Sequence, residues 1–525
     1  MSILPAYKLS DVAAVSVFAI LVFALVSSLF FRRSKVTKLV SPESPSWLWG
    51  CTRDLLLGVS GDYFEAWQKK FGDIYRIPYP CGSWRTIIMD PRAMSYVLNT
   101  NSYNFVRHKG NVAVFNIMLG GGILAYEGEA HRRHRKSMTP GLSVGAIRYY
   151  TTLFLTAVTK VMEQWRSQLE AEIDKKNMIV NMEQWMNAVS FESIGQAGFN
   201  HDFGCTSGII HPVANHLTAL GKSSTTIGSL MVLGLVQAFP AVLRLPLHRN
   251  HVMKNIRTSM TEVARSFRSR LQNAKSDVSD DHRSLVASIM KAEGRALSES
   301  EVISEMNTLL LAGFETTATT MTWCFHELSV NTRVQDRLRE ELKNYPEPTY
   351  EQMATEMPYL TAVVQETLRT HPGSQETHRI AANDDTIPLQ SLATTADGKV
   401  VDHIDIRAGT GIIIPIEAIN RSTMIWGPDS HEFKPERWLT DLPEKAKNIQ
   451  GYHHLMTFID GPRNCIGRNF SVAEFKAVLA VLVRHFYFAP LKDGSDVVRV
   501  RTFTSRARNK GYEGLMLRVS KVESE

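Results

Sequence analysis

The chain has 525 residues, of which 44% are hydrophobic and 21% are charged, values close to those of ordered globular proteins. This composition excludes a largely disordered or low-complexity protein, and the length allows one unusually large domain or two fused domains. The formal net charge of +7 is compatible with a nucleic acid, an anionic membrane surface or an acidic protein as partner. Charge alone does not decide between them.

The first element expected along the chain is a membrane anchor. Val12–Phe31 is a run of 20 uncharged residues, and a helix of that length spans the roughly 30 Å hydrocarbon core of a bilayer. Basic residues follow it at Arg32, Arg33, Lys35 and Lys38, which predicts that the rest of the chain faces the cytoplasm. A cleaved signal peptide is the alternative, but its apolar run is shorter and its positive charge comes first.

The domain boundaries follow from this anchor. We expect a tip and transmembrane helix over residues 1–31, a basic and proline-containing linker over 32–48, and a catalytic domain over 49–525. The uncharged segment Ser223–Leu243 has two interpretations, a second membrane span or a membrane-dipping loop and helix pair at the mouth of a pocket. The second is preferred, because another span would divide the globular part across the bilayer.

The globular part is predicted to be mainly helical with small sheets. Asp73–Pro78 and Trp84–Met89 alternate around turn residues and predict a hairpin. Apolar residues then recur with helical period over Val144–Ile173, Glu183–Gly198, Lys254–Lys275, Ser298–Val330, Thr332–Leu342 and Met357–Thr370. Short strand-like segments return at Thr386–Leu389, Lys399–Val401, Gly411–Ile416 and Gly514–Val519.

The five cysteines are widely spaced, odd in number and contain no Cys-x-x-Cys pair, which argues against a zinc site or a disulfide framework. An isolated cysteine is most often a small buried apolar side chain. Cys465 differs, because it lies in a glycine-rich loop, Phe458–Gly467, that leads into an apolar helical pattern. A helix amino terminus lowers the pKa of a thiol and favours a thiolate ligand to iron. Gly461 and Gly467 would let the backbone approach a flat macrocycle.

At this loop the chain resembles the cytochrome P450 family, in particular its fungal microsomal members, and the resemblance extends from the anchor to the last strands. It implies haem b with the Cys465 thiolate as axial ligand to the iron, and Phe458 and Arg463 as further haem-binding residues. Two departures from the family pattern stand nearby. Ile459 occupies a position that is generally small, and Gly373 stands where a second proline is common.

Three further groups of residues match motifs of the cytochrome P450 family. Glu366 and Arg369 lie three residues apart, which alone describes an ordinary surface ion pair. The resemblance instead implies a buried Glu-Arg-Arg network completed by Arg437, with a structural role. His131, Arg135 and Arg379 match positions that bind the haem propionates, although His131 stands where the family often has tryptophan; a solvated basic surface is the alternative for the cluster around His131.

The predicted helix from Ser298 to Val330 begins with a capping box between Ser298 and Glu301. Ala312 and Gly313, at its middle, would leave space for substrate over the haem. Glu315 and Thr316 resemble the family's acid and alcohol pair that delivers protons to oxygen, whereas without the resemblance they would be a polar notch in a buried helix.

The function implied is a monooxygenase that inserts one atom of O2 into a lipophilic small molecule, for example a terpenoid or another fungal secondary metabolite. NADPH would supply electrons through a flavoprotein reductase, and no nucleic acid partner is expected. We expect a single-pass protein of the endoplasmic reticulum membrane in contact with lipid. An oxygen-independent haem-thiolate isomerase and a non-catalytic haem protein are the alternatives; Glu315 and Thr316 count against the first, and the intact haem-binding motifs against the second.

Overall fold

The structure is a computed structural model and describes residues 36–172, 176–208, 236, 240–245, 247–273, 284–502 and 504–522. The predicted anchor, Val12–Phe31, and most of the segment 223–243 lie outside these residues. Within them, no helix combines the length and the apolar character that crossing a bilayer requires.

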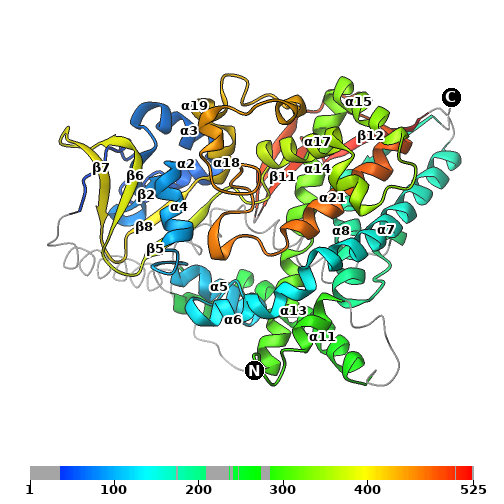
Figure 1. Cartoon of the computed structure of the whole chain (residues 1–525), viewed down its shortest axis with the longest axis horizontal. Coiled ribbons are helices and arrows are strands. Elements are labelled where there is room, and N and C mark those ends of the chain that lie inside the picture. Colours follow the sequence, from blue (N-terminus) through cyan, green and yellow to red (C-terminus); the bar gives the residue numbers. More distant parts are fainter. Residues whose placement is uncertain are drawn as a thin grey trace, which may run out of the picture.

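One side of the molecule is built on a mixed sheet (Figure 1). Its strand order is β1-β2-β8-β5-β3. The strands are β1 (Ile74–Tyr79), β2 (Ser83–Ile88), β8 (Gly411–Ile414), β5 (Thr377–Ala381) and β3 (Phe105–Val106). The predicted hairpin is confirmed, because β1 and β2 pair antiparallel with Ile74 opposite Ile88. β8 joins β2 in parallel, which brings segments more than 300 residues apart into one sheet.

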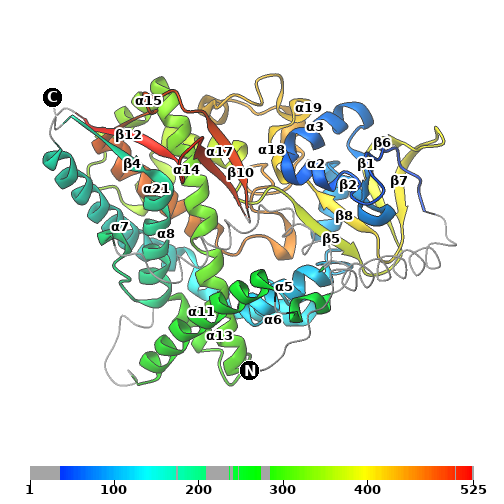
Figure 2. The same ribbon diagram turned by 180° about the vertical axis from the view of Figure 1, so that it is seen from behind.

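The other side is a bundle of helices, seen from behind in Figure 2. Its main members are α7 (Val144–Ala171), α8 (Met182–Phe199), α14 (Glu315–Val330), α17 (Pro358–Thr370) and α21 (Arg468–His485). α7 packs against α8 and α21, and α14 packs against α8. Ser143 caps α7 by accepting a hydrogen bond from the Ala146 amide. The prediction of a mainly helical fold with small sheets is therefore confirmed.

The remaining elements surround these two parts. The helices are α2 (Thr52–Leu57), α3 (Ser60–Phe71), α4 (Pro91–Ser95), α5 (Lys109–Leu119), α6 (Gly128–Met138), α11 (His248–Asn273), α12 (Leu285–Met290), α13 (Glu299–Ala312), α15 (Thr332–Lys343), α16 (Tyr350–Thr355), α18 (Ile416–Arg421), α19 (Thr423–Trp426) and α20 (Glu444–Lys447). The small sheets comprise β4 (Asn177–Asn181), β12 (Met516–Lys521) and β9 (Phe486–Ala489); β10 (Val497–Arg501) and β11 (Ser505–Asn509); and β6 (Asp385–Thr394) and β7 (Val400–Ile406).

The long helix predicted from Ser298 to Val330 is interrupted. Its start is as predicted, because Ser298 and Glu301 form the capping box. The helix then breaks at Gly313 and Phe314, between α13 and α14. Glycine is a poor helix former, and the Thr316 hydroxyl donates to the Ala312 carbonyl at 3.1 Å, the acceptor that the Thr316 amide would use in a continuous helix. The break lies at the cavity described next.

Candidate active site

A cavity of about 300 Å³ lies between the helix break and the loop that precedes α21. Its lining brings together residues that are far apart in the sequence. The predicted site residues that line it are Ala312, Gly313, Thr316, His131, Arg135, Phe458, Arg463, Cys465 and Gly467. Most of the other lining side chains are apolar, and they include Ile123, Leu124, Met138, Ile194 and Leu309.

The Cys465 thiol is accessible from this cavity. The loop is held by the Cys465 amide, which donates to the Phe458 carbonyl at 2.8 Å. Burial raises the pKa of the thiol, while the Gly467 amide, Arg135 and Arg468 act to lower it. The backbone amide at the helix start thus acts on the Cys465 pKa in the predicted direction, but desolvation is the larger effect in the protein without metal. Coordination to a cation such as haem iron would deprotonate the thiol.

The loop conformation also explains two residues noted in the sequence. Gly461 has φ +73°, and a Cβ there would meet the Leu98 carbonyl, so this glycine allows close packing on the backbone of another segment. Gly461 does not line the cavity, whereas Gly467 does. Ile459 has φ +59°, a conformation that is strained for a β-branched residue. A small residue at this position would be less strained.

Buried positive charge gathers at one edge of the cavity. Glu127 pairs with the Arg463 guanidinium and lies 3.6 Å from that of Arg107. Arg379 lies near both arginines, and burial together with their charges lowers the pKa of Arg379 to about 9. Thus three guanidinium groups face one carboxylate among the described residues, and Arg107 Nη1 and Arg463 Nε lack hydrogen-bond partners within that part of the chain.

An excess of two buried positive charges calls for an anionic partner. The two propionates of haem would supply this charge, so the donor set fits the predicted cofactor at both ends, with the Cys465 thiol at the cavity and the arginines at its edge. Arg107 and Glu127 were missed by the sequence analysis. Only the fold brings Arg107 and Glu127 beside Arg463.

Some basic residues of α6 line the cavity and the others lie at the surface. Arg135 lines the cavity and donates to the Asn464 carbonyl at 2.8 Å, which ties α6 to the cysteine loop. His131 is buried beside the Tyr103 hydroxyl at 3.3 Å. Burial and the neighbouring arginines lower the pKa of His131 to about 4, so it is neutral at pH 7 and can donate a hydrogen bond to a propionate.

Above the cysteine loop, Thr316, Ala312 and Gly313 line the cavity. Glu315 is oriented differently. Its carboxylate accepts from the Arg506 guanidinium at 2.7 Å and is absent from the lining. Arg506 also pairs with Glu183 at 3.0 Å. In this structure the acid and the alcohol are therefore adjacent in sequence but face different surroundings.

The structure brings together the three residues of the predicted Glu-Arg-Arg network. Glu366 and Arg369 are fully buried and form two hydrogen bonds of 2.8 and 2.9 Å. Arg437 lies 3.6 Å from the Glu366 carboxylate, which also accepts from the Trp438 indole at 2.9 Å. Arg369 also donates to the Ser430 carbonyl at 2.6 Å and thereby fixes the segment before Arg437. These contacts support a structural role.

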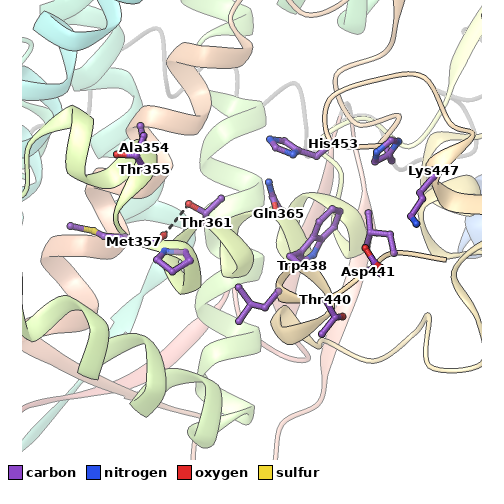
Figure 3. A pocket seen from close by; sticks show the side chains of 14 residues that line it. Ala354, Thr355, Met357, Thr361, Gln365, Trp438, Thr440, Asp441, Lys447 and His453 are labelled. Carbon is purple, nitrogen blue, oxygen red and sulfur yellow. Dashed lines mark hydrogen bonds between the residues drawn. The ribbon is translucent and has the colours of Figure 1, made fainter. Parts of the chain in front are cut away.

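A second pocket, of about 500 Å³, lies between the start of α17 and the segment that contains Trp438 (Figure 3). Its lining includes Gln365, Thr361 and His453. None of the predicted site residues lines it. The smaller cavity is therefore the candidate active site, because only that one has the thiol and the propionate-binding residues at its walls.

Comparison with known proteins agrees with this geometry. The family model described as Cytochrome P450 matches residues 40–510. Cytochrome P450 monooxygenase claW from Ampulloclitocybe clavipes is 38% identical over 542 aligned positions, which cover 100% of both chains. Cytochrome P450 monooxygenase claO from the same fungus is 38% identical with 94% of each chain covered, and Cytochrome P450 monooxygenase 205 from Postia placenta is 31% identical with 92% of each covered. The chain belongs to the cytochrome P450 family and is a haem-thiolate monooxygenase.

Proposed function

We propose that this enzyme inserts one oxygen atom from O2 into a lipophilic small molecule of the terpenoid or related secondary-metabolite type. The observation that carries the proposal is that Cys465 and Thr316 face one cavity whose remaining walls are largely apolar. A substrate there would be held by shape and by the removal of apolar surface from water rather than by ion pairs.

Haem, when bound, supplies the oxidising chemistry. The protein's residues position the cofactor and the reactants. Cys465 would hold the iron, and Arg107, Arg135, Arg379 and Arg463 would hold the propionates. Ala312 and Gly313 keep side-chain volume low at the helix break, which leaves room for substrate. The Thr316 hydroxyl, now donating to the Ala312 carbonyl, would donate a proton within the cavity.

Electrons would come from NADPH through a flavoprotein reductase. Arg132 and Lys136 are exposed on α6, and Arg135 of the same helix contacts the cysteine loop. This basic surface would attract an acidic reductase near the cofactor. Both neighbouring arginines are partly neutralised, because Arg132 pairs with Glu129 and Arg133 pairs with Glu301 at 2.6 Å. We also propose a single-pass location in the endoplasmic reticulum membrane with the catalytic domain in the cytoplasm, which rests on the charge pattern around Val12–Phe31.

The test is expression of the chain with a matched fungal reductase, followed by mass-spectrometric profiling of lipophilic products under isotopically labelled O2. Incorporation of one labelled oxygen atom that depends on NADPH and on Cys465 is expected. A product formed without O2 would favour the haem-thiolate isomerase instead. Haem binding without any turnover of a broad terpenoid panel would contradict the proposed substrate class.

A further inference from the structure

A buried acid and base pair lies beside the cavity and is not used by the residues described above. His134 of α6 and Glu305 of α13 have no exposed side-chain surface, and His134 Nδ1 lies 2.5 Å from a Glu305 carboxylate oxygen. The Tyr126 ring packs on the imidazole with 4.5 Å between ring centroids. Proton-sharing groups that are buried so completely are uncommon, because burial disfavours their charged forms.

One end of this pair reaches the surface. His134 Nε2 lies 3.2 Å from Glu301 Oε1, and the Glu301 side chain is 15% exposed. Arg133 pairs with the same carboxylate oxygen and is 43% exposed. Solvent therefore reaches Glu301 directly, and Glu301 is within hydrogen-bond distance of the otherwise buried imidazole.

The other end of the pair lies next to residues that line the cavity, although Glu305 itself does not line it. Glu305 Oε2 is buried and has no hydrogen-bond partner of good geometry within the described residues, and the Ile123 amide lies near the Glu305 carboxyl group. A Cβ built on Gly122 would lie 3.5 Å from this oxygen and 2.5 Å from the Thr308 hydroxyl, so both oxygens flank the space that the glycine leaves open. Thr308 and Ile123 line the cavity. A water molecule in the cavity at Thr308 would complete the hydrogen bonding of Glu305 Oε2.

The groups capable of exchanging protons follow one face of the interrupted helix. The spacing along this helix is three or four residues, which places the residues on the same side. They are Glu301, Glu305, Thr308 and Thr316, with the Ala312 carbonyl as an acceptor between the last two. The line runs from solvent at Glu301 to the Thr316 hydroxyl and the Ala312 carbonyl. Between Thr308 and Thr316 the connection runs through the cavity itself.

The charges around the pair favour transfer rather than a fixed ion pair. Hydrogen bonds from Ser298 and His134 and the charge of Arg133 outweigh desolvation and lower the pKa of Glu301 to about 2, so this carboxylate stays ionised. Burial, together with the charge of Glu301, raises the pKa of Glu305, whereas His134 lowers it. The pKa of Glu305 is therefore displaced toward the protonated form, and Tyr126 and Arg133 are further titratable or charged groups beside the pair.

Glu315, the acid next to Thr316, is less suited to this task in the observed arrangement. It pairs with Arg506, and moving it into the cavity would leave the mostly buried Arg506 with Glu183 alone. The Glu305 route requires no ion pair to be broken.

We propose that His134 and Glu305 form a proton relay that carries protons from solvent at Glu301 to cavity water at Thr308, and from there to Thr316. The proposal rests on the proposed monooxygenase function, whose balance is RH + O2 + 2 H⁺ + 2 e⁻ → ROH + H2O, with the electrons supplied by the reductase. For each proton, His134 accepts it on the Glu301 side and passes one to Glu305, and Glu305 releases one to cavity water.

The test uses the haem-loaded, membrane-bound enzyme with its reductase and a substrate that the parent oxidises. Glu305→Gln keeps the shape of the side chain but cannot carry a proton. We expect haem content at the parent level, product formation lower by about 10- to 100-fold, NADPH oxidation diverted to hydrogen peroxide, and a larger solvent isotope effect. Glu192→Gln is the matched control, because Glu192 is equally buried but binds the amides of Phe203 and Cys205 instead of a histidine. It should keep the parent isotope effect.

A readout without turnover separates a relay from a structural tie between α6 and α13. The infrared difference between the parent and Glu305→Gln should contain a carboxyl band that shifts within minutes in D2O. If Glu305→Gln fails to hold haem, Glu301→Gln takes its place, because glutamine also forms a capping box, and it should raise the isotope effect.

Parent-level coupling and isotope effects in these variants would refute the relay, and so would a Glu305 band that fails to exchange. A parent enzyme that forms no oxygenated product would instead refute the proposed function. The two failures are therefore distinguishable.

Discussion

The excess positive charge beside the cavity leads to a prediction with opposite effects on the haem-free and haem-loaded protein. Arg379 is 5% exposed, and burial together with Arg107 and Arg463 lowers its pKa from 12.5 to about 9. At about 1.36 kcal/mol for each tenfold change, the charged guanidinium carries roughly 5 kcal/mol of unfavourable free energy. Below pH 9 it is charged in both the folded and the unfolded chain, so the full penalty applies at neutral pH.

Arg379→Met removes this penalty. It also removes hydrogen bonds to the Thr377 hydroxyl at 2.6 Å and the His378 carbonyl at 2.8 Å, which contribute about 1 kcal/mol each. The haem-free variant should therefore gain roughly 3 kcal/mol in its free energy of unfolding. The haem-loaded variant should lose a charged hydrogen bond to a propionate, worth about 1.5–3 kcal/mol, and release haem about 10- to 100-fold faster.

The two effects need two assays. Chemical denaturation of the haem-free protein, followed by circular dichroism, measures the first, and transfer of haem to excess apomyoglobin measures the second. Arg295→Met is the control, because Arg295 is exposed and does not line the cavity, and neither quantity should change. A haem-free Arg379→Met protein that is less stable than the parent, with haem release at the parent rate, would refute the charge argument.

Four further predictions concern ligand, proton delivery, membrane attachment and electron supply. Cys465→Ala should abolish the thiolate-type spectrum of the reduced carbon monoxide complex, and its persistence would exclude this ligand. Thr316→Ala should retain haem but lower product per NADPH by about tenfold or more, with unchanged coupling as the contrary result. Deleting residues 1–31 should release much of the protein from membranes, whereas full retention after carbonate washing would indicate another span. Replacing Arg132 and Lys136 by Glu should slow reduction by the reductase at low salt but not at high salt, and equal rates at both would exclude this docking surface.

The sequence predicted features that depend on local patterns. The β1–β2 hairpin and the capping box at Ser298 follow from neighbouring residues and are confirmed. Arg107 and Glu127 were not predicted, because their roles arise from segments that meet only in the fold. The orientation of Glu315 was also beyond sequence reasoning, since its partner Arg506 lies 191 residues away.

Three features of the site are unfavourable for the haem-free chain: a strained backbone, a broken helix and buried like charges. Together they link haem binding to folding. Ile459 holds a left-handed backbone conformation, which costs about 1–3 kcal/mol. The α13–α14 helix is broken at the cavity, where the Thr316 hydroxyl takes over the Ala312 carbonyl. The buried arginines repel one another. Each departure faces the cavity or its edge, and a dianionic cofactor with an iron centre would relieve the electrostatic one. Haem bound there would therefore stabilise the fold by removing a penalty already present in the haem-free protein, and part of its binding free energy would come from the relief of this repulsion between arginines.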